Sequence, residues 1–459
     1  MEEEDAVLID IDGALATSIQ RKLRSLKREP NEKSPLCIFR VPAHVRESNK
    51  NYYEPRIVSI GPYHRGSKHL RAMEDHKWLY LQDFLSRDPE NSLQTYVDEL
   101  KALEPSARRF YFESVDMEND EFTKMMLLDG CFILEFLLKW YYGPHDSVFD
   151  VDWSIYLIAV DLLMLENQIP FFVLERLYHL QKAPDGSSTD LIDDVDSPSL
   201  VDLLVNYLMN GDVASPISIT AGEIHHLLHL YYYCIVPDQK LPSKSSKMYN
   251  FLLQLRSFIQ RMTCRSPPSS NTRAPRMIPC ATELQESGVT FKRKKPDILF
   301  DITFDDGLLE IPYLAIQEST KYSFMNLIAF EQCIERKKRY LTSYAAFMDC
   351  IINTGKDVAI LQRSGIIENK LASEEEVAIF FNHLRDGSYI DYEDHYHVGT
   401  FRAVEDYYKS RWHRYRARMC HDYFRNPWSI LSLLAAVALL LLTLTQTVFS
   451  ILAYVQPPS

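Results

Sequence analysis

Residues 154–181 read SIYLIAVDLLMLENQIPFFVLERLYHLQ, and they are apolar enough to raise the question whether they cross a membrane or lie inside a protein core. Asp161 and Glu166 would each cost about 2.5–3.5 kcal/mol at the centre of a bilayer. Pro170 also interrupts a helix, because it lacks an N–H donor. The stretch therefore predicts a pair of buried helices.

Two polar residues lie in the middle of this apolar stretch. Glu166 and Asn167 would be buried there, and buried polar groups need hydrogen-bond partners. We expect those partners to be Arg176 or backbone amides freed near Pro170.

The helical pattern extends to both sides, since apolar residues recur every three or four positions through most of residues 69–180 and again after residue 318. Between these regions the period changes, and VTFKR, ILFDITF and LLEIPYLAI favour strands. Asp306-Gly307 between two of them is a hairpin signal. The sequence therefore predicts a mainly α fold with a small β-hairpin or sheet element (α+β).

Near the C-terminus, residues 430–455 carry no charge, and at about 1.5 Å per residue a helix of this length exceeds the hydrocarbon core of about 30 Å. This predicts a single C-terminal transmembrane helix, with Trp428, Ile430, Leu440 and Val455 as anchor residues. Basic residues precede it: Lys409, Arg411, Arg414, Arg416, Arg418 and Arg425. By the positive-inside rule we expect a single-pass protein, at the plasma membrane, with most of the chain cytosolic.

The expected organisation follows from these segments. It comprises an amphipathic N-terminal helix at 1–34, a mainly helical domain at 35–408 with variable loops at 181–199 and 237–279, a basic juxtamembrane helix at 409–428, the membrane helix at 429–455 and a short tail at 456–459.

Composition excludes several classes of function. The chain has 459 residues, with 50 Lys+Arg against 63 Asp+Glu and a net charge of −13, which argues against a nucleic-acid partner. Its 14 glycines make phosphate-binding loops improbable on composition, and the eight cysteines form no C-x-x-C pair that would suggest zinc or redox chemistry. We expect no cofactor.

Some residues resemble catalytic or metal-binding patterns but do not complete one. Asp10 and Asp12 resemble the D-x-D-G start of aspartyl-nucleophile phosphatases, but residues 8–26 favour one helix where that mechanism needs a strand, and no β-α alternation follows. Among His225, His226 and His229, the first and last lie one helical turn apart, as metal ligands often do, but the H-E-x-x-H signature and a third ligand are absent. His395 and His397 favour a solvated loop, and the acids Asp297, Asp301, Asp305 and Asp306 lack the spacing of a Ca²⁺ loop. We therefore expect no catalytic or metal site.

Several longer strings carry a family resemblance. They are CIFRVPAHVRESNKNYYEPRIVSIGPYHRG at 37–66, MLLDGCFILEFL at 126–137, DLLMLENQIPFFVLERL at 161–177, ATELQESGVTFKRKKPDILFDITFDDGLLEIPYLAI at 281–316, NLIAFEQC at 326–333 and YFRNPWSILSLL from 423. In this order they resemble the large plant family catalogued as domain of unknown function 247, from about residue 36 to 455. The positions that match as structural residues are Pro42, Gly61, Pro62, Glu166, Asn167, Pro170 and Glu331.

The resemblance implies no established enzymatic activity. Members in grasses are associated with the pollen side of self-incompatibility, where paired polymorphic proteins act with small secreted stigma proteins, and others are linked to defence or development. We therefore expect a non-enzymatic, membrane-anchored recognition or signalling protein, with a pollen-side self-incompatibility determinant as one form of it. Its expected partners are the membrane, a paired family member and a small secreted protein.

Two other functions remain open at the level of sequence. One is a membrane-tethered, metal-dependent hydrolase that uses Asp10 and Asp12 or a histidine cluster. The other is a lipid-binding scaffold in defence or development, which would bind headgroups through the basic residues before the membrane helix.

Overall fold

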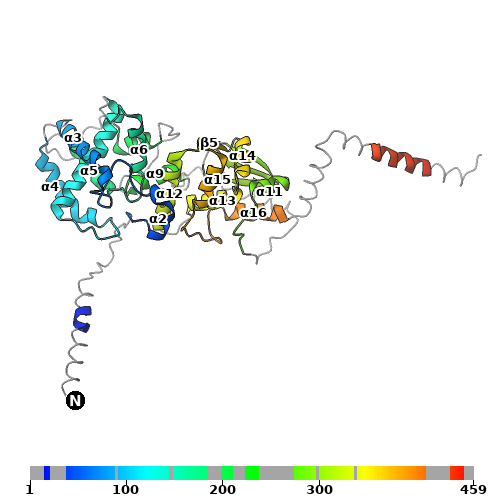
Figure 1. Cartoon of the computed structure of the whole chain (residues 1–459), viewed down its shortest axis with the longest axis horizontal. Helices are drawn as coiled ribbons and strands as arrows, with labels where there is room; N and C mark the ends of the chain where they lie inside the picture. The colour runs from blue at the N-terminus through cyan, green and yellow to red at the C-terminus, as the bar shows by residue number, and fades with distance from the viewer. Residues whose placement is uncertain are drawn as a thin grey trace, which may run out of the picture. The chain divides into compact units, whose positions relative to one another are not determined.

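The computed structural model describes residues 15–20, 38–87, 91–143, 148–182, 198–209, 223–236, 273–295, 299–334, 339–409 and 435–448 (Figure 1). The chain divides into two compact units, Met1–Leu36 and Cys37–Ser459. In the first unit the described residues 15–20 form a helix with Leu15 and Ile19 exposed, and the rest of the helix predicted at 1–34 lies outside the described residues.

Helices of the first half of the second unit pack around one hydrophobic core, which we call the first core. Its centre is α5, which is buried at every residue from Met125 to Lys139, because most of these residues are apolar and the three charged ones among them, Asp129, Glu135 and Lys139, are ion-paired. Figure 1 shows α3 and α4 grouped with it. The elements of this half that follow residue 60 are η2 (Lys68–Leu70), α3 (Arg71–Arg87), α4 (Leu93–Arg108), α5 (Asn119–Tyr142), α6 (Asp152–Leu162), α7 (Phe171–Lys182) and α8 (Leu200–Leu208). The two elements before it, α2 (Ala43–Asn49) and η1 (Lys50–Tyr52), pack instead against the second core through Val45 and Tyr52.

The second core is built on α13, where every residue except Asp349 is buried. Helix α9 contributes to both cores, since Leu227 and Leu230 pack in the first and Leu228 and Tyr232 in the second. The elements are α9 (Leu227–Ile235), α11 (Ala281–Glu286), α12 (Glu318–Cys333), α13 (Tyr340–Ile351), α14 (Gly355–Arg363), α15 (Glu374–His383) and α16 (Val398–Lys409).

Two small sheets cover part of the second core. In the first sheet β3 (Leu308–Pro312) lies between β1 (Thr290–Lys294), which is parallel to it, and β2 (Thr303–Asp305), which is antiparallel. The second sheet pairs β4 (Leu314–Ile316) with β5 (Ile367–Asn369) in parallel. The hairpin turn between β2 and β3 is at Asp306 (φ 40°) and Gly307 (φ 84°), as a primed turn requires. The predicted α+β class and hairpin are confirmed.

The predicted transmembrane helix at 429–455 is wrong in this structure. Within the described residues no helix is both long and apolar enough to cross a bilayer. The described helix in this region covers 435–448 and includes Leu440; it rises about 21 Å at about 1.5 Å per residue, which is less than the hydrocarbon thickness of about 30 Å. The single-pass plasma-membrane location inferred from that helix is not supported.

Other parts of the predicted organisation fall mostly outside the described residues. Lys409 ends α16 and pairs with Glu405 at 2.8 Å. The anchor residues Trp428, Ile430 and Val455, the remaining basic residues from 410 to 428, the tail at 456–459 and most of the loops at 181–199 and 237–279 lie outside the described residues.

Candidate functional site

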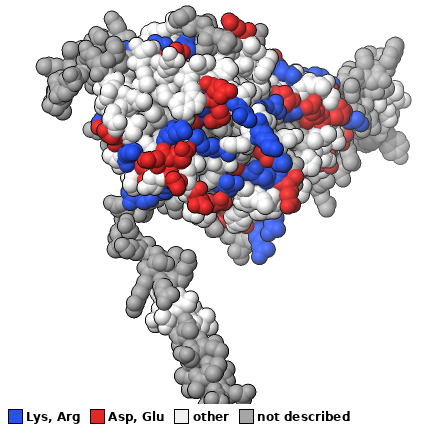
Figure 2. All heavy atoms as spheres, turned by 60° about the vertical axis from the view of Figure 1, so that its left-hand side comes forward, with Lys and Arg blue, Asp and Glu red and all other residues white. Residues whose placement is uncertain are grey.

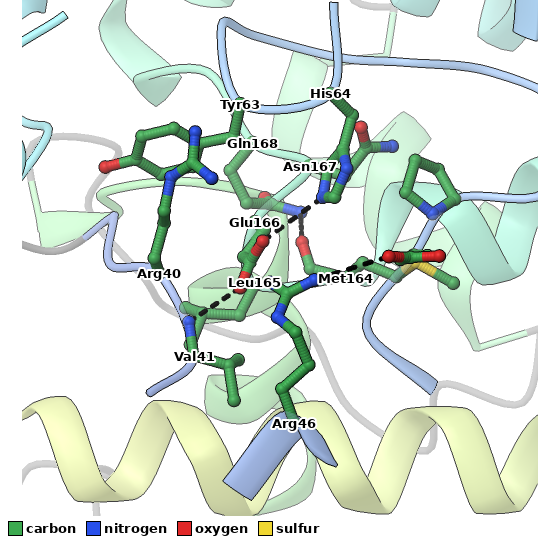
Figure 3. A network of polar contacts seen from close by, with 12 residues as sticks. Arg40, Val41, Arg46, Tyr63, His64, Met164, Leu165, Glu166, Asn167 and Gln168 are labelled. Atoms are coloured by element: carbon green, nitrogen blue, oxygen red, sulfur yellow. Dashed lines mark hydrogen bonds and ion pairs between the residues drawn. The ribbon is translucent and has the colours of Figure 1, made fainter. Parts of the chain in front are cut away.

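The loop between α6 and α7 carries a set of buried polar side chains at the junction of the two cores (Figure 3). Asp161 at the end of α6 and Glu166, Asn167 and Gln168 in the loop are all at most 1% exposed. The two predicted helices, α6 and α7, are present and separated by a buried polar break, but α6 is buried on one side only, since Trp153 and Tyr156 are exposed. Polar groups that are buried so completely are stable only when each finds a partner.

Asp161 and Asn167 bind an extended segment, residues 55–61, which we call the strap. The strap belongs to no strand, so its amides need side-chain acceptors. Asp161 accepts the N–H groups of Ile57 at 2.8 Å and Val58 at 3.0 Å, together with that of Arg56. Asn167 accepts the N–H of Ile60 at 2.6 Å and donates to the Val58 carbonyl at 3.1 Å. Burial raises the pKa of Asp161 to about 6, although these bonds lower it.

Glu166 binds residues that precede the strap and one that follows it. Its carboxylate accepts the Val41 N–H at 2.6 Å and pairs with Arg46, and its other oxygen lies 3.3 Å from His64 Nε2 (Figure 3). Burial alone would raise the pKa of Glu166, but the contacts with His64, Arg46 and Val41 hold it below its usual value. Arg46 also reaches Glu54 at 3.7 Å.

Arg176, the partner considered for Glu166 from the sequence, instead pairs with Glu99 at 2.8 Å. The actual partners of Glu166 lie more than a hundred residues earlier in the chain.

The same loop is also tied to the second core. Asn326 of α12 accepts the Leu165 N–H at 3.0 Å and donates to the Tyr52 carbonyl at 2.8 Å. Gln168 accepts the N–H of Leu228, in α9, at 3.2 Å. The loop therefore joins the strap, the first core and the second core through side-chain hydrogen bonds.

The remaining predicted family positions have structural surroundings. Glu331 is buried and accepts the N–H groups of Leu341 and Thr342 at 2.9 and 2.7 Å, so it caps the start of α13. Burial raises its pKa above the usual value despite these bonds. Pro42 precedes α2, Pro62 follows the strap and Pro170 immediately precedes α7, where a fixed φ suits a helix start.

The histidine clusters make internal contacts. His226 accepts the His229 N–H at 3.2 Å and caps α9, and His229 in turn accepts the N–H of His225. His395 contacts the Ser343 hydroxyl at 2.8 Å, and Ser343 also accepts the His397 N–H.

The described part of the chain holds no group of three or more His, Cys, Asp and Glu side chains placed to bind a metal. Asp301 pairs with Lys294 at 2.6 Å, and Asp305 and Asp306 lie at the hairpin. Asp10, Asp12 and Asp297 lie outside the described residues.

Acid should weaken the fold through the buried imidazoles. Burial lowers the pKa of His397 to about 3 and that of His395 to about 4, against about 6.5 in an unfolded chain. The contribution of each neutral imidazole to the unfolding free energy is therefore fully present above pH 6.5 and is lost as the pH falls towards the folded pKa. At pH 5 each imidazole has lost about 2 kcal/mol of this contribution. The pKa of Asp161 is raised on folding, so its protonation stabilises the fold as the pH falls. At pH 5 this offsets about 1 kcal/mol of the loss caused by the imidazoles. We expect His397→Met to reduce the difference in unfolding free energy between pH 7 and pH 5 by about 2 kcal/mol, measured by urea denaturation.

His383, exposed on α15 beside Asp386, provides the control for removal of a surface imidazole, and His397→Met should change the pH dependence of stability more than His383→Met does. If His397→Met and the parent lost stability equally between pH 7 and pH 5, the buried ring would not be the source of the acid sensitivity.

Glu166→Gln should lower the unfolding free energy by about 2 kcal/mol. The substitution removes the negative charge that pairs with Arg46 and leaves a neutral acceptor in its place. The control is Glu113→Gln, which removes the exposed pair with Arg40 at 3.0 Å and should cost less than about 1 kcal/mol. Chemical denaturation at pH 7 measures both. Equal losses would show that burial adds nothing to the Glu166 pair.

Comparison with known proteins shows which family the whole chain resembles. The model of a family described as plant protein of unknown function, DUF247, matches residues 38–442. The chain is similar to a UPF0481 protein of Arabidopsis thaliana, with 32% identity over 438 residues that cover 92% of this chain and 87% of that protein. A second UPF0481 relative from Arabidopsis thaliana is 23% identical, over 94% of this chain and 93% of the relative. No solved structure gives a significant match.

Proposed function

The chain belongs to the DUF247 family of plant proteins, and from this premise we propose that it is a non-enzymatic recognition or signalling protein that acts by binding other proteins. The observation that carries the proposal is a set of exposed large aromatic side chains on a scaffold with well-filled cores. Trp78, Phe112 and Trp153 are 50–60% exposed. Aromatic residues are enriched at protein interfaces, where they supply most of the binding energy.

The chemistry of the buried acids supports the same proposal. Asp161, Glu166 and Glu331 accept backbone N–H groups of the fold, so their carboxylates are engaged in holding segments together. A catalytic acid instead has to reach a substrate in an accessible cleft. A pollen-side role in self-incompatibility, with a paired family member and a small secreted protein as partners, is a narrower form of the proposal and rests on the family resemblance alone.

Proximity labelling with the full chain in pollen and in leaf tests the proposal. We expect a defined set of proteins that binds the purified chain directly and is lost when Trp153 and Phe112 are both changed to serine. The matched control changes the buried Phe132 to leucine, which perturbs the core but leaves the surface intact, and should retain the partners.

An enzymatic result would contradict the proposal. Metal-dependent turnover of phosphoester substrates by the purified chain, abolished by Asp10→Asn, would show that the protein is a hydrolase.

A further inference from the structure

A solvent-exposed groove lies beside the strap, next to the Glu166 network. It has a volume of about 300 Å³ and is lined by Asn51, Glu54, Pro55, Arg56 and His69. Glu54, which Arg46 connects to Glu166, forms part of its wall. A volume of this size is at the lower end of ligand pockets and accommodates a side chain rather than a large molecule.

Arg56 is the one strongly basic side chain that lines this groove, and its position is fixed from two sides. Its backbone N–H is bound by the buried Asp161 carboxylate at 2.9 and 3.0 Å. Its guanidinium lies 4.4 Å from the centre of the Tyr322 ring, and Tyr322 is itself buried against Tyr52. A guanidinium held over a ring loses little side-chain entropy when it binds a ligand.

Within the described part of the chain the Arg56 guanidinium forms no direct ion pair, and the buried Asp161 carboxylate interacts with its charge only at longer range. Among the described residues no carboxylate lies within ion-pair distance of it, and its side chain is exposed. Glu54 is already engaged by Lys50 at 3.5 Å and by Arg46 at 3.7 Å. A guanidinium presents a planar fork of donors that matches the two oxygens of a carboxylate.

We propose that this groove binds a carboxylate presented by an acidic segment of a protein partner, with Arg56 as the residue that recognises it. The proposal deepens the proposed function and rests on it, since it names a surface and a partner chemistry for recognition.

Exposed aromatic residues of α6, the helix whose Asp161 holds the Arg56 N–H, favour a protein partner over a free small acid. Tyr156 of α6 lies close enough to Arg56 to feel its charge and is 38% exposed. Trp153, three residues earlier on the same helix and therefore on the same face, is 60% exposed. Trp, Tyr and Arg are the residue types that dominate binding energy at protein interfaces. Figure 2 shows basic and acidic side chains interspersed on the face that it displays.

Calorimetric titration of the full chain tests the site with three probes: acetyl-tetraglutamate amide, the matching tetraglutamine peptide and inorganic phosphate. We expect the glutamate peptide to bind with a Kd of about 0.1–1 mM and the glutamine peptide to show no binding. Arg56→Gln should raise the Kd of the glutamate peptide by about tenfold or more. Arg56→Lys should raise it by less, because lysine keeps the positive charge but lacks the planar pair of donors of a guanidinium.

Arg363→Gln is the matched control, since Arg363 is exposed on α14 and bonds to a carbonyl of its own helix. Circular dichroism should show that all variants are folded, because the Arg56 main-chain bonds are kept. Unchanged binding in Arg56→Gln, or an equal loss in Arg363→Gln, overturns the site. If inorganic phosphate binds with a Kd as low as that of the glutamate peptide, the proposal that the partner is an acidic protein segment is wrong.

The proposed function and the groove can fail separately. If Arg56→Gln loses the peptide but keeps every labelled partner in plant cells, the groove is not the recognition surface although the chain is a recognition protein. If the chain has no direct partner but still binds the peptide through Arg56, the recognition function fails and the carboxylate site stands.

Discussion

Lys77→Ala should lower the unfolding free energy by about 3–5 kcal/mol, because it leaves a buried carboxylate without its counter-ion. Lys77 is completely buried on α3, and its Nζ lies 2.7 Å from Asp129 Oδ1 and 2.6 Å from Glu74 Oε1. It also donates to the Ser59 carbonyl in the strap. Burial raises the pKa of Asp129, and Lys77 is the main group that opposes this, so the variant should favour a protonated Asp129.

Urea denaturation at pH 7 measures this loss, and Lys101→Ala is its control. Lys101 pairs with Asp120 at 2.9 Å with both side chains exposed, so removing it should cost less than about 1 kcal/mol. Lys77→Met combined with Asp129→Asn should regain part of the stability, because the charge is removed while an acceptor remains for the Gly61 N–H. Equal losses for Lys77→Ala and Lys101→Ala would contradict a buried, unscreened ion pair.

Gly61→Ala should cost about 3 kcal/mol or more, from two causes that add. Gly61 has φ +76°, which disfavours any side chain by about 1–2 kcal/mol. In addition, a Cβ would lie 2.5 Å from the Gln168 carbonyl oxygen, a backbone atom of the buried loop that cannot move freely. The overlap would push the strap away from the loop and weaken the bond from the Gly61 N–H to Asp129 at 2.8 Å.

Gly66 separates the two causes, because its φ is +80° and a Cβ there would meet nothing within 4 Å. Gly66→Ala should therefore cost only the conformational part, about 1–2 kcal/mol. Thermal and urea unfolding of both variants give the difference. If the two substitutions cost the same, the close approach of strap and loop contributes nothing to stability.

Local sequence rules predicted the elements whose causes are local. The helix pair followed from apolar residues interrupted by Pro170, and the hairpin followed from Asp306-Gly307. The need of Glu166 for a partner was also readable, because a carboxylate in an apolar stretch must be paired. Its identity was not, since Arg46 lies 120 residues earlier and no spacing rule connects two such positions.

The features that the sequence did not predict depend on contacts between residues far apart in the chain. The parallel pairing of β1 with β3, and of β4 with β5 far along the chain, depends on contacts that short strands do not encode. Lys77 and Asp129 lie 52 residues apart on two helices, and only the packing of those helices shows that both side chains are buried and paired. The C-terminal apolar run predicted a membrane helix from composition alone, whereas the described helix at 435–448 is too short for one.

The side-chain bonds that hold the strap also set an order of events during synthesis. Val58 leaves the ribosome 103 residues before Asp161, which at roughly 5–20 residues per second is a delay of about 5–20 s. The interval is longer for the Tyr52 carbonyl, just before the strap, because its partner Asn326 is made 274 residues later. The strap amides are therefore without their acceptors until about residue 167 has been made, whereas the neighbouring Tyr52 carbonyl has its partner only after the second half of the chain has emerged.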